Sequence, residues 1–502
     1  MYRTVCVPDL SALWGDWNLI ELKNVSFEYE NGASGALKDV SIQINAGECV
    51  LICGESGCGK TTITRLVNGL IPHYYEGNLS GSVSVGKLDI TTADLSETAR
   101  YVGSVFQNPR SQFFCVDTTS EIAFGCENAG LLEEDIRQRV WQAAKELKME
   151  HLLGRNIFEL SGGEKQKVAC ASVSAEHPEV FVLDEPTSNL DTDAIEDLKK
   201  TLLLWKSQGK TILIAEHRLY WLKEICDRVI YMKDGKVLFD LSINEFLQFS
   251  QEQMENLGLR TLSPEKLKVS GNFVSPDREL LLKNFNFSYK NKDALQIPSL
   301  SLPVGGIIAV IGHNGAGKST FSNCLCGLKK HFKGNIVVDK EKLGRRKLLK
   351  KCYMVMQDVN HQLFCETVED EVELGMDKAD ENAVKTVLTA LGLFETAKRH
   401  PMSLSGGQKQ RVAVASAILA DKQILIFDEP TSGLDYKHME QTADLIASLQ
   451  GKKTVFIVTH DPELMVRCCT HILHLENGMV VENYALNEKT VDKLTRFFSN
   501  KS

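Results

Sequence analysis

The sequence has no apolar stretch long enough to cross a bilayer. Its longest apolar runs are strand-sized, such as Thr211–Ala215, whereas a membrane-spanning helix needs roughly 18 or more consecutive apolar residues. The first ten residues contain one arginine and no extended apolar core, which is not the pattern of a secretory signal peptide. From these two absences we expect a cytosolic chain.

Excess positive charge and paired cysteines are also missing. The formal net charge of −9 argues against a general nucleic-acid binder, which needs a basic face. The 14 cysteines are scattered and include no paired C-x-x-C elements with metal-ligand spacing. With 43% apolar and 25% charged residues over 502 positions, the composition is that of an ordinary globular protein, and the length predicts more than one domain.

A glycine-rich loop follows an apolar run early in the chain. Residues 54–61 read G-E-S-G-C-G-K-T, after Val50–Cys53 and before a segment that can be helical, which is the G-x-x-x-x-G-K-[ST] pattern in its strand–loop–helix context. Its glycines let consecutive N–H groups surround a phosphate at the positive end of the helix. Lys60 can reach phosphate oxygens, and the Thr61 hydroxyl can ligate Mg²⁺. The pattern recurs at 312–319, G-H-N-G-A-G-K-S, so the sequence predicts two such sites.

The two loops belong to a long internal repeat. The strand-like segment Leu22–Tyr29 has a counterpart in Leu282–Tyr289, and the offsets between matched residues fall from 258 to 243 along the chain. A repeat of this length is a complete domain rather than a solenoid unit. Each copy alternates strand-like and helical runs, which predicts an α/β domain with a mostly parallel sheet. The matched residues are Lys60 with Lys318, Gln107 with Gln357, Ser161 with Ser405, Asp184 with Asp428, and His217 with His460.

Each copy also contains an apolar run that ends in two acidic residues. The runs are Val180–Leu183 and Ile424–Phe427. Residues that directly follow such a buried strand lie at the carboxyl edge of the sheet, where α/β proteins bind ligands. The first acid of each pair can hold Mg²⁺ through water, and the second can polarise an attacking water. The acid pairs are Asp184 with Glu185 and Asp428 with Glu429.

A Ser-Gly-Gly sequence opens a helical run in each copy. The two occurrences are Ser161-Gly162-Gly163 and Ser405-Gly406-Gly407. Serine at this position is commonly a helix N-cap, and a helix that begins in this way can also bind an anion. The residues alone leave both interpretations open.

With these motifs in tandem, the sequence resembles the nucleotide-binding domains of ABC ATPases over nearly its whole length. The resemblance implies two P-loop NTPase domains of the α/β class, each with a mostly parallel sheet core, an antiparallel β edge and a helical subdomain. It also implies ATP hydrolysis, with ATP and Mg²⁺ bound. We place an irregular leader at 1–18, the first ATPase domain at 19–245, a linker at 246–278, the second ATPase domain at 279–490 and a C-terminal tail at 491–502.

The resemblance assigns roles to individual residues. The expected catalytic residues are Glu185, His217, Glu429 and His460. The expected nucleotide-binding residues are Tyr29, Gly54, Gly57, Gly59, Lys60, Thr61, Thr62, Ser161, Gly162, Gly163, Tyr289, Gly312, Asn314, Gly315, Gly317, Lys318, Ser319, Thr320, Ser405, Gly406 and Gly407. The expected Mg²⁺-site residues are Thr61, Gln107, Asp184, Ser319, Gln357 and Asp428. Because neither copy has lost a motif residue, both sites are expected to hydrolyse ATP.

The family arrangement would make the two copies a head-to-tail pair within one chain. Lys60, Glu185 and His217 would then face Ser405, and the matching residues of the second copy would face Ser161.

The segments after Gln107 and Gln357 are similar to the Q-N-P-x-x-Q-[LF]-F pattern of energy-coupling-factor transporter ATPases, which serve vitamin and nickel/cobalt uptake. The sequence reads Q-N-P-R-S-Q-F-F in the first copy and Q-D-V-N-H-Q-L-F in the second; Arg110 and Val359 depart from the pattern. The resemblance implies a groove for an integral membrane coupling subunit, a separate substrate-capture subunit, and a location on the cytoplasmic face of the membrane. We expect Gln112 and Gln362 to support membrane recruitment.

Two other classes fit less well. A soluble twin ABC ATPase acting on ribosomes would carry a long charged linker and basic surfaces, whereas this linker is shorter and the total charge is negative. A fused sugar-importer ATPase would have a second copy degraded at its catalytic positions. No nucleic-acid partner is therefore expected.

Overall fold

The computed structural model of this chain forms two compact units, residues 1–188 with 194–262 and residues 263–502 with 189–193. The residues whose structure is described are 18–30, 35–188, 190–264, 267–269, 278–290 and 292–499. Most of the expected leader, 1–17, lies outside them, as does the greater part of the segment 265–277.

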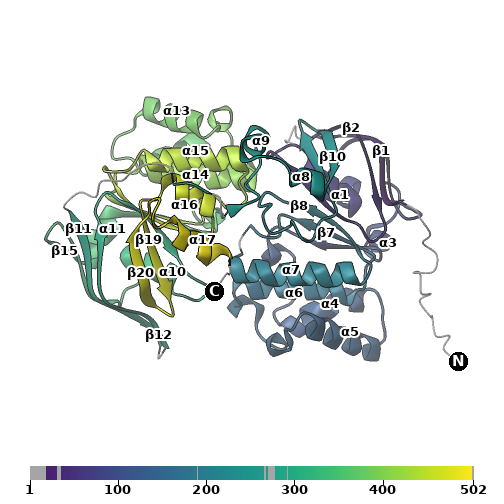
Figure 1. The fold of residues 1–502 in the computed structure, drawn as a ribbon, viewed down its shortest axis with the longest axis horizontal. Coiled ribbons are helices and arrows are strands. Elements are labelled where there is room, and N and C mark those ends of the chain that lie inside the picture. Colours follow the sequence, from purple (N-terminus) through teal and green to yellow (C-terminus); the bar gives the residue numbers. More distant parts are fainter. Residues whose placement is uncertain are drawn as a thin grey trace. The chain divides into compact units, whose positions relative to one another are not determined.

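The first unit contains two sheets (Figure 1). The antiparallel sheet has the order β2 (Leu37–Asn45), β1 (Asn18–Tyr29), β4 (Gly77–Val85) and β5 (Leu88–Asp89). The mainly parallel sheet has the order β10 (Lys236–Ser242), β9 (Arg228–Lys233), β3 (Cys49–Gly54), β8 (Thr211–Ala215), β7 (Val180–Asp184) and β6 (Val102–Val105). Its one antiparallel pairing joins β9 to β10.

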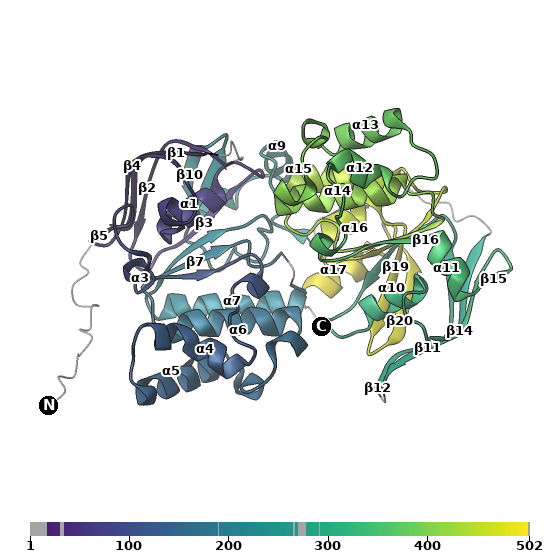
Figure 2. The same cartoon turned by 180° about the vertical axis from the view of Figure 1, so that it is seen from behind.

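The helices of the first unit connect these strands. They are α1 (Lys60–Val67), α2 (Leu70–His73), α3 (Leu95–Thr98), α4 (Thr118–Asn128), α5 (Glu133–Glu146), α6 (Gly162–Ala175), α7 (Thr192–Ser207), α8 (Ile243–Phe246) and α9 (Gln251–Asn256). Helices α4 and α5, between β6 and the Ser-Gly-Gly helix α6, form the helical subdomain, and α6 and α7 run side by side (Figures 1 and 2).

The second unit repeats this order. Its antiparallel sheet has the order β12 (Lys292–Pro303), β11 (Glu279–Tyr289), β14 (Lys333–Val338) and β15 (Glu341–Leu343). Its other sheet has the order β16 (Cys352–Val355), β17 (Ile424–Asp428), β18 (Thr454–Val458), β13 (Ile307–Ile311), β19 (His471–Glu476) and β20 (Met479–Ala485). The helices are α10 (Lys318–Leu325), α11 (Arg345–Lys351), α12 (Val368–Glu373), α13 (Glu381–Ala390), α14 (Gly406–Leu419), α15 (Tyr436–Ala447), α16 (Pro462–Cys468) and α17 (Val491–Ser499).

The central parallel strands are buried along their whole length. Strands β3, β8, β13, β17 and β18 expose none of their residues, as expected for parallel strands that are covered on both faces. One core of each unit joins the antiparallel sheet, the helix after the glycine-rich loop and one face of the parallel sheet; Phe27, Ile63 and Ile52 belong to this core in the first unit. This packing fixes the glycine-rich loop at the end of its strand.

Two segments outside the expected domains are also packed. Phe246 and Met254 are almost fully buried, and the hydroxyl of Tyr231 donates to the carbonyl of Leu257 at 2.7 Å. Part of the segment that we expected to be a linker therefore extends the first unit to Leu262. At the other end, α17 occupies the expected tail, with Leu494 fully buried.

The architecture confirms the α/β fold expected from the sequence, with a mainly parallel sheet, an antiparallel sheet and a helical region in each copy. Among the described residues, no helix combines the length and apolar character that a bilayer crossing requires.

Candidate nucleotide sites

The glycine-rich loop of the first copy joins β3 to α1 and encloses the Lys60 side chain. Lys60 is 4% exposed, and its ammonium donates to the carbonyls of Gly54 and Glu55, each at 3.0 Å. Gly54 has a φ of 147°, and a Cβ there would overlap the carbonyl oxygen of Met232. The loop thus holds its lysine by backbone carbonyls, from which it can turn to phosphate oxygens.

The acid pair of the first copy lies beside this loop. The Thr61 hydroxyl donates to Asp184 at 3.2 Å, the Gln107 amide donates to Glu185 at 2.6 Å, and His217 Nε2 lies 3.3 Å from the Glu185 carboxylate. The structure therefore brings together five of the residues singled out in the sequence. Gln107 follows β6, Asp184 ends β7 with Glu185 after it, and His217 follows β8. This is the carboxyl edge of the sheet, where ligand sites of α/β proteins are found, and Thr61 reaches it from α1.

Burial and the neighbouring charges set opposite pKa shifts in this acid pair. Burial, together with the charge of Glu185, raises the pKa of Asp184 to about 7. Burial alone would also raise the pKa of Glu185, but the contact with His217 and the charge of Lys60 outweigh it and lower that pKa. Glu185 is therefore held as a carboxylate that can accept a proton, and Asp184 lies where a cation would stabilise its charge.

A third carboxyl group, which we did not single out in the sequence, also belongs to this site. Glu216 directly precedes His217, accepts a hydrogen bond from the His217 backbone N–H at 2.8 Å, and accepts a short one from the Thr187 hydroxyl. Burial raises the pKa of Glu216 to about 7, and the charge of nearby Glu185 adds to the shift. The acid directly before the histidine was the available signal.

Glu216 makes the stability of the first unit pH-dependent. Its pKa of about 7 in the folded chain exceeds the ordinary value of 4.5, so the folded state holds the proton more tightly. The resulting stabilisation is complete below about pH 4.5 and is lost as the pH rises through 7, by up to about 3 kcal/mol. We expect Glu216→Gln to flatten this dependence, as measured by thermal unfolding at pH 5, 6, 7 and 8. Glu134→Gln, on the exposed face of α5, is the matched control; an unchanged pH profile in Glu216→Gln would contradict the assignment.

The second copy builds the same site, with its lysine held as closely but its hydroxyl farther from the acid. Lys318 donates to the carbonyls of Gly312 and His313 at 2.6 and 3.0 Å, and the Ser319 hydroxyl lies 3.5 Å from Asp428. Burial raises the pKa of Asp428 to about 6, against the opposing charge of Lys318. Asn314 and Gly315 are exposed at the tip of the loop, and Gln357 is also exposed.

The surroundings of the second glutamate differ from those of the first. Thr459, the counterpart of Glu216, donates to Glu429 at 3.3 Å, and His460 Nε2 lies 4.0 Å from the Glu429 carboxylate. Thr431 donates to Asp461 at 2.8 Å. In the second site the threonine-bound carboxyl group is therefore Asp461, which directly follows the histidine, whereas Glu216 directly precedes it in the first.

Both glutamates adopt an unusual backbone conformation. Glu185 has a φ of 44° and Glu429 a φ of 52°. A positive φ is uncommon for a residue other than glycine, and such strain often accompanies functional sites. After this turn the Glu185 carboxylate lies beside Gln107 and His217, and the Glu429 carboxylate lies on the side of His460.

The Ser-Gly-Gly motifs are helix N-caps in this structure. The hydroxyl of Ser161 accepts from the N–H of Glu164 at 3.3 Å, and the Glu164 carboxylate accepts from the N–H of Ser161 at 2.7 Å. Ser405 and Gln408 form the same reciprocal pair. The capping interpretation therefore holds, and the glycines that follow, Gly162 and Gly163 or Gly406 and Gly407, form the first turn of α6 or α14.

The two tyrosines expected to stack on adenine have different surroundings. Tyr29 is 8% exposed, and its hydroxyl contacts Thr62 at 3.1 Å and accepts from Arg65 at 3.0 Å. Tyr289 is 45% exposed, with the Lys329 ammonium 4.8 Å from its ring centre. The exposed ring of Tyr289 is available for stacking on a base. The ring of Tyr29 is buried, and its hydroxyl contacts two side chains of α1.

Gln112 and Gln362 face inward and hold the loop after the parallel strand. Gln112 accepts from the N–H of Phe106 at 3.3 Å and donates to the carbonyl of Ser104 at 3.1 Å. Gln362 makes the same two bonds, with Met356 and Met354, each at 3.0 Å. Both amides hold the loop itself, and their support of membrane recruitment stays a prediction.

The same loops expose a phenylalanine in each copy. Phe114 and Phe364 are 76% and 75% exposed. A buried glutamate fixes each of them: Glu121 accepts from the N–H of Phe114 at 2.9 Å, and Glu371 accepts from the N–H of Phe364 at 2.6 Å. Each copy thus presents a large apolar side chain to solvent from a backbone position that a buried carboxylate holds.

The residues near the loops fit a bound Mg²⁺ ion. Thr61 with Asp184, and Ser319 with Asp428, each place a hydroxyl beside a carboxylate, and Mg²⁺ accepts such oxygen donors. In the part of the chain that is described, no group of three or more His, Cys, Asp or Glu residues could hold a metal ion. Most ligands of a Mg²⁺ ion here would therefore come from nucleotide and water, as is usual for this ion.

Comparison with known proteins agrees with this arrangement. The family model described as "ABC transporter" matches residues 37–188 and 295–432. A protein of Treponema denticola that is named as an ABC transporter ATP-binding protein is 46% identical over 479 residues, which cover 94% of this chain and 98% of the relative. YkoD of Bacillus subtilis, named for HMP/thiamine import and ATP binding, is 32% identical over 492 residues, or 91% of this chain and 90% of the relative.

Among solved structures, the archaeal ribosome recycling factor aABCE1, in complex with ribosomal stalk protein aP1, matches with a TM-score of 0.64. The match covers 94% of this chain and 92% of that one at 21% identity, and it supports the fold alone. Together with the family model and the relatives, the repeated site shows that this chain belongs to the ABC transporter ATPase family, as two ABC ATPase domains in tandem that bind and hydrolyse ATP.

Proposed function

We propose that this chain is the ATP-hydrolysing subunit of an energy-coupling-factor-type importer for a vitamin or a transition-metal ion. In this proposal it binds an integral membrane coupling subunit and acts with a substrate-capture subunit, at the cytoplasmic face of the membrane. The two ATPase domains form a head-to-tail pair, in which Ser161 and Ser405 each close on the nucleotide of the other copy. ATP joins the two domains electrostatically, and hydrolysis weakens the joint.

The proposed chemistry follows from the contacts around Glu185. Its carboxylate is held between Gln107 and His217, where it can take a proton from an attacking water. Lys60 moves from its loop carbonyls to phosphate oxygens, and Mg²⁺, held by Thr61 and Asp184, neutralises phosphate charge when bound. Glu429, His460, Lys318, Ser319 and Asp428 act in the same way in the second copy.

The exposed phenylalanines carry the transport proposal. An apolar side chain that is three-quarters exposed, on a backbone held by a buried carboxylate, is suited to entering a partner's surface. Its occurrence at matched positions in both copies fits a partner with two matched contacts. The name of the Bacillus subtilis relative, which refers to HMP/thiamine import, supports a vitamin as the solute.

We expect Phe114→Ala with Phe364→Ala to lower recovery of the chain with membrane subunits by about tenfold or more. The loss follows from removing two exposed apolar anchors while leaving the loop's own hydrogen bonds in place. The measurement is co-purification with integral membrane proteins from the native membrane, with ATP hydrolysis of the free chain as a second readout.

Tyr74→Ala is the matched control, because Tyr74 is also a strongly exposed aromatic residue, at 72%, and follows α2 outside these two loops. If the double variant still co-purifies like the unchanged chain, the transport proposal loses its main support. Recovery with ribosomes instead would favour the twin-ATPase class.

A further inference from the structure

Positive charge is concentrated in one segment of the second copy. Residues 328–351 contain ten lysine or arginine side chains and two acidic ones, a net charge of +8, in a chain whose formal net charge is −9. The equivalent segment of the first copy, residues 70–101, contains two basic and four acidic side chains, a net charge of −2. Both segments connect the helix after the glycine-rich loop to the next parallel strand, so the fold does not require the basic residues.

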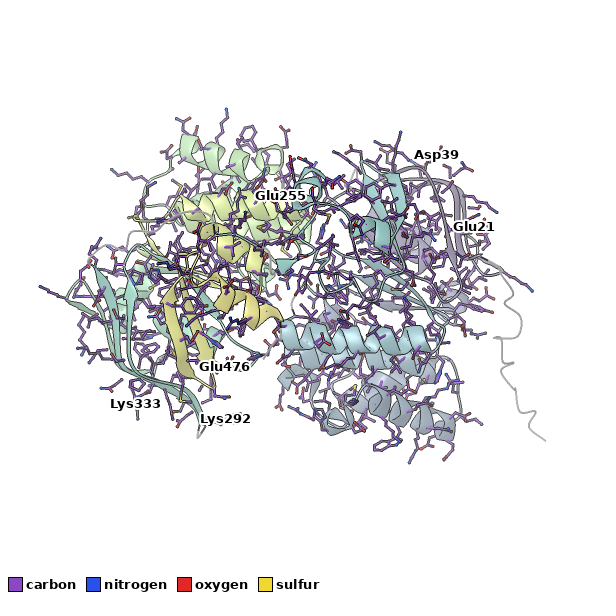
Figure 3. The ribbon with its side chains drawn as sticks, in the orientation of Figure 1. Glu21, Asp39, Glu255, Lys292, Lys333 and Glu476 are labelled. Atoms are coloured by element: carbon purple, nitrogen blue, oxygen red, sulfur yellow. The ribbon has the colours of Figure 1, made fainter. Side chains whose placement is uncertain are left out.

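The basic side chains lie on neighbouring elements: α11, strands β14 and β15, and the loops before and between these strands. Lys347 and Lys351 of α11 contact Glu341 of β15 at 2.7 and 2.9 Å. Arg345 donates to the carbonyl of Gly327 at 3.0 Å, which brings the loop before β14 against the start of α11. Figure 2 shows α11 beside β15, and Figure 3 labels Lys333 on the same sheet. We call this surface the basic face; its residues are Lys329, Lys330, Lys333, Lys340, Lys342, Arg345, Arg346, Lys347, Lys350 and Lys351.

Few of these charges are neutralised within the chain. Asp339 pairs with Arg278, which lies outside the segment, and Glu341 is shared by Lys347 and Lys351. Hydrogen bonds from these two lysines lower the pKa of Glu341 to about 2. The other eight basic-face residues form no ion pair with any described residue: Lys329, Lys330, Lys333, Lys340, Lys342, Arg345, Arg346 and Lys350.

The remaining features of the basic face distinguish between possible partners. Leu328 and Leu349 are 43% and 42% exposed among the lysines, and eight of the ten basic residues are lysine. Lysine ammonium groups are point charges on flexible side chains. Together with scattered apolar side chains, they suit binding to the headgroup layer of a lipid bilayer. A single-stranded nucleic acid would call for several exposed aromatic platforms. Within 328–351 the one Phe, Tyr or Trp residue, Phe332, packs against the apolar core, and the exposed ring beside Lys329 is that of Tyr289, which is expected to stack on adenine.

We propose that the basic face is a docking surface for the anionic headgroups of a lipid bilayer. The attraction needs lipid alone, so it is independent of any membrane subunit and of the importer assignment. It orients the second copy against the membrane, and the first copy has no matching face.

The experiment uses the full chain and vesicles of phosphatidylcholine, alone or mixed with phosphatidylglycerol, in a sedimentation assay. We expect binding to the mixed vesicles only, weakened by added salt because salt shortens the range of the attraction. K342E/R346E/K350E should lower the affinity by about tenfold or more, while ATP hydrolysis in solution persists and shows that the variant is folded.

The matched control is K145E/K236E/K452E, which makes the same change in net charge at exposed lysines outside the basic face. This variant should bind the mixed vesicles like the unchanged chain. Equal binding to both vesicle types, equal losses in both triple variants, or binding to single-stranded RNA without binding to vesicles would each overturn the proposal.

Discussion

Replacing Glu185 and Glu429 together by glutamine is expected to lower steady-state ATP hydrolysis by about a hundredfold or more. Glutamine keeps the size of the side chain and can still hydrogen-bond to Gln107, but it cannot take a proton from water. ATP binding should persist, because neither glutamate belongs to the glycine-rich loops. Phosphate release measures the first effect, and equilibrium dialysis with labelled ATP measures the second.

The single variants show whether the two copies depend on each other. Glu134→Gln with Glu252→Gln, at two exposed positions, controls for the loss of two negative charges. If the Glu185→Gln, Glu429→Gln double variant turns over ATP at the original rate, neither glutamate is the base. If ATP binding is also lost, the substitutions have instead disturbed the glycine-rich loops, and thermal unfolding at a lower temperature would show this.

Replacing Lys60 by alanine is expected to remove most of the phosphate affinity of the first site, by about a hundredfold. The ammonium is held 3.0 Å from two loop carbonyls, so it is already at the phosphate end of the loop and only has to exchange partners. Lys318→Ala should have the same effect on the second site. Each single variant should then bind one ATP per chain at concentrations that saturate two sites in the original protein.

Lys87→Ala, an exposed lysine in the turn between β4 and β5, is the control and should keep two sites. The double variant Lys60→Ala, Lys318→Ala should bind no nucleotide in this range. Two bound nucleotides in either single variant would mean that its lysine does not hold phosphate.

Short sequence patterns correctly predicted the elements whose conformation is set by residues adjacent in the sequence. The strand–loop–helix order of 54–61, the buried strand before Asp184, and the helix that begins after Ser161 each follow from a short stretch of sequence. Repetition made them stronger predictions, because the same order occurs at 312–319 and before Asp428. The α/β architecture followed from these elements.

Two kinds of feature could not be predicted from the sequence. The first is the set of contacts that a side chain makes outside its own motif, and the second is local charge that the net charge of the whole chain conceals. Whether Gln112 points inward is decided by the carbonyl of Ser104, eight residues earlier, and not by the residues beside it. Tyr29 and Tyr289 end matched strands, yet Arg65 reaches only the first, since the second copy has Asn323 at that position. The basic face was hidden because a net charge of −9 averages over the whole chain.

The left-handed backbone of Glu185 and Glu429 restricts which residues can replace them. A copy of this domain that gave up catalysis would accept glycine or asparagine there, since both tolerate this conformation, whereas valine or isoleucine would strain the turn as well as remove the carboxylate. We therefore expect that a copy of this domain that loses catalysis during evolution loses the carboxylate but keeps the left-handed turn of the backbone.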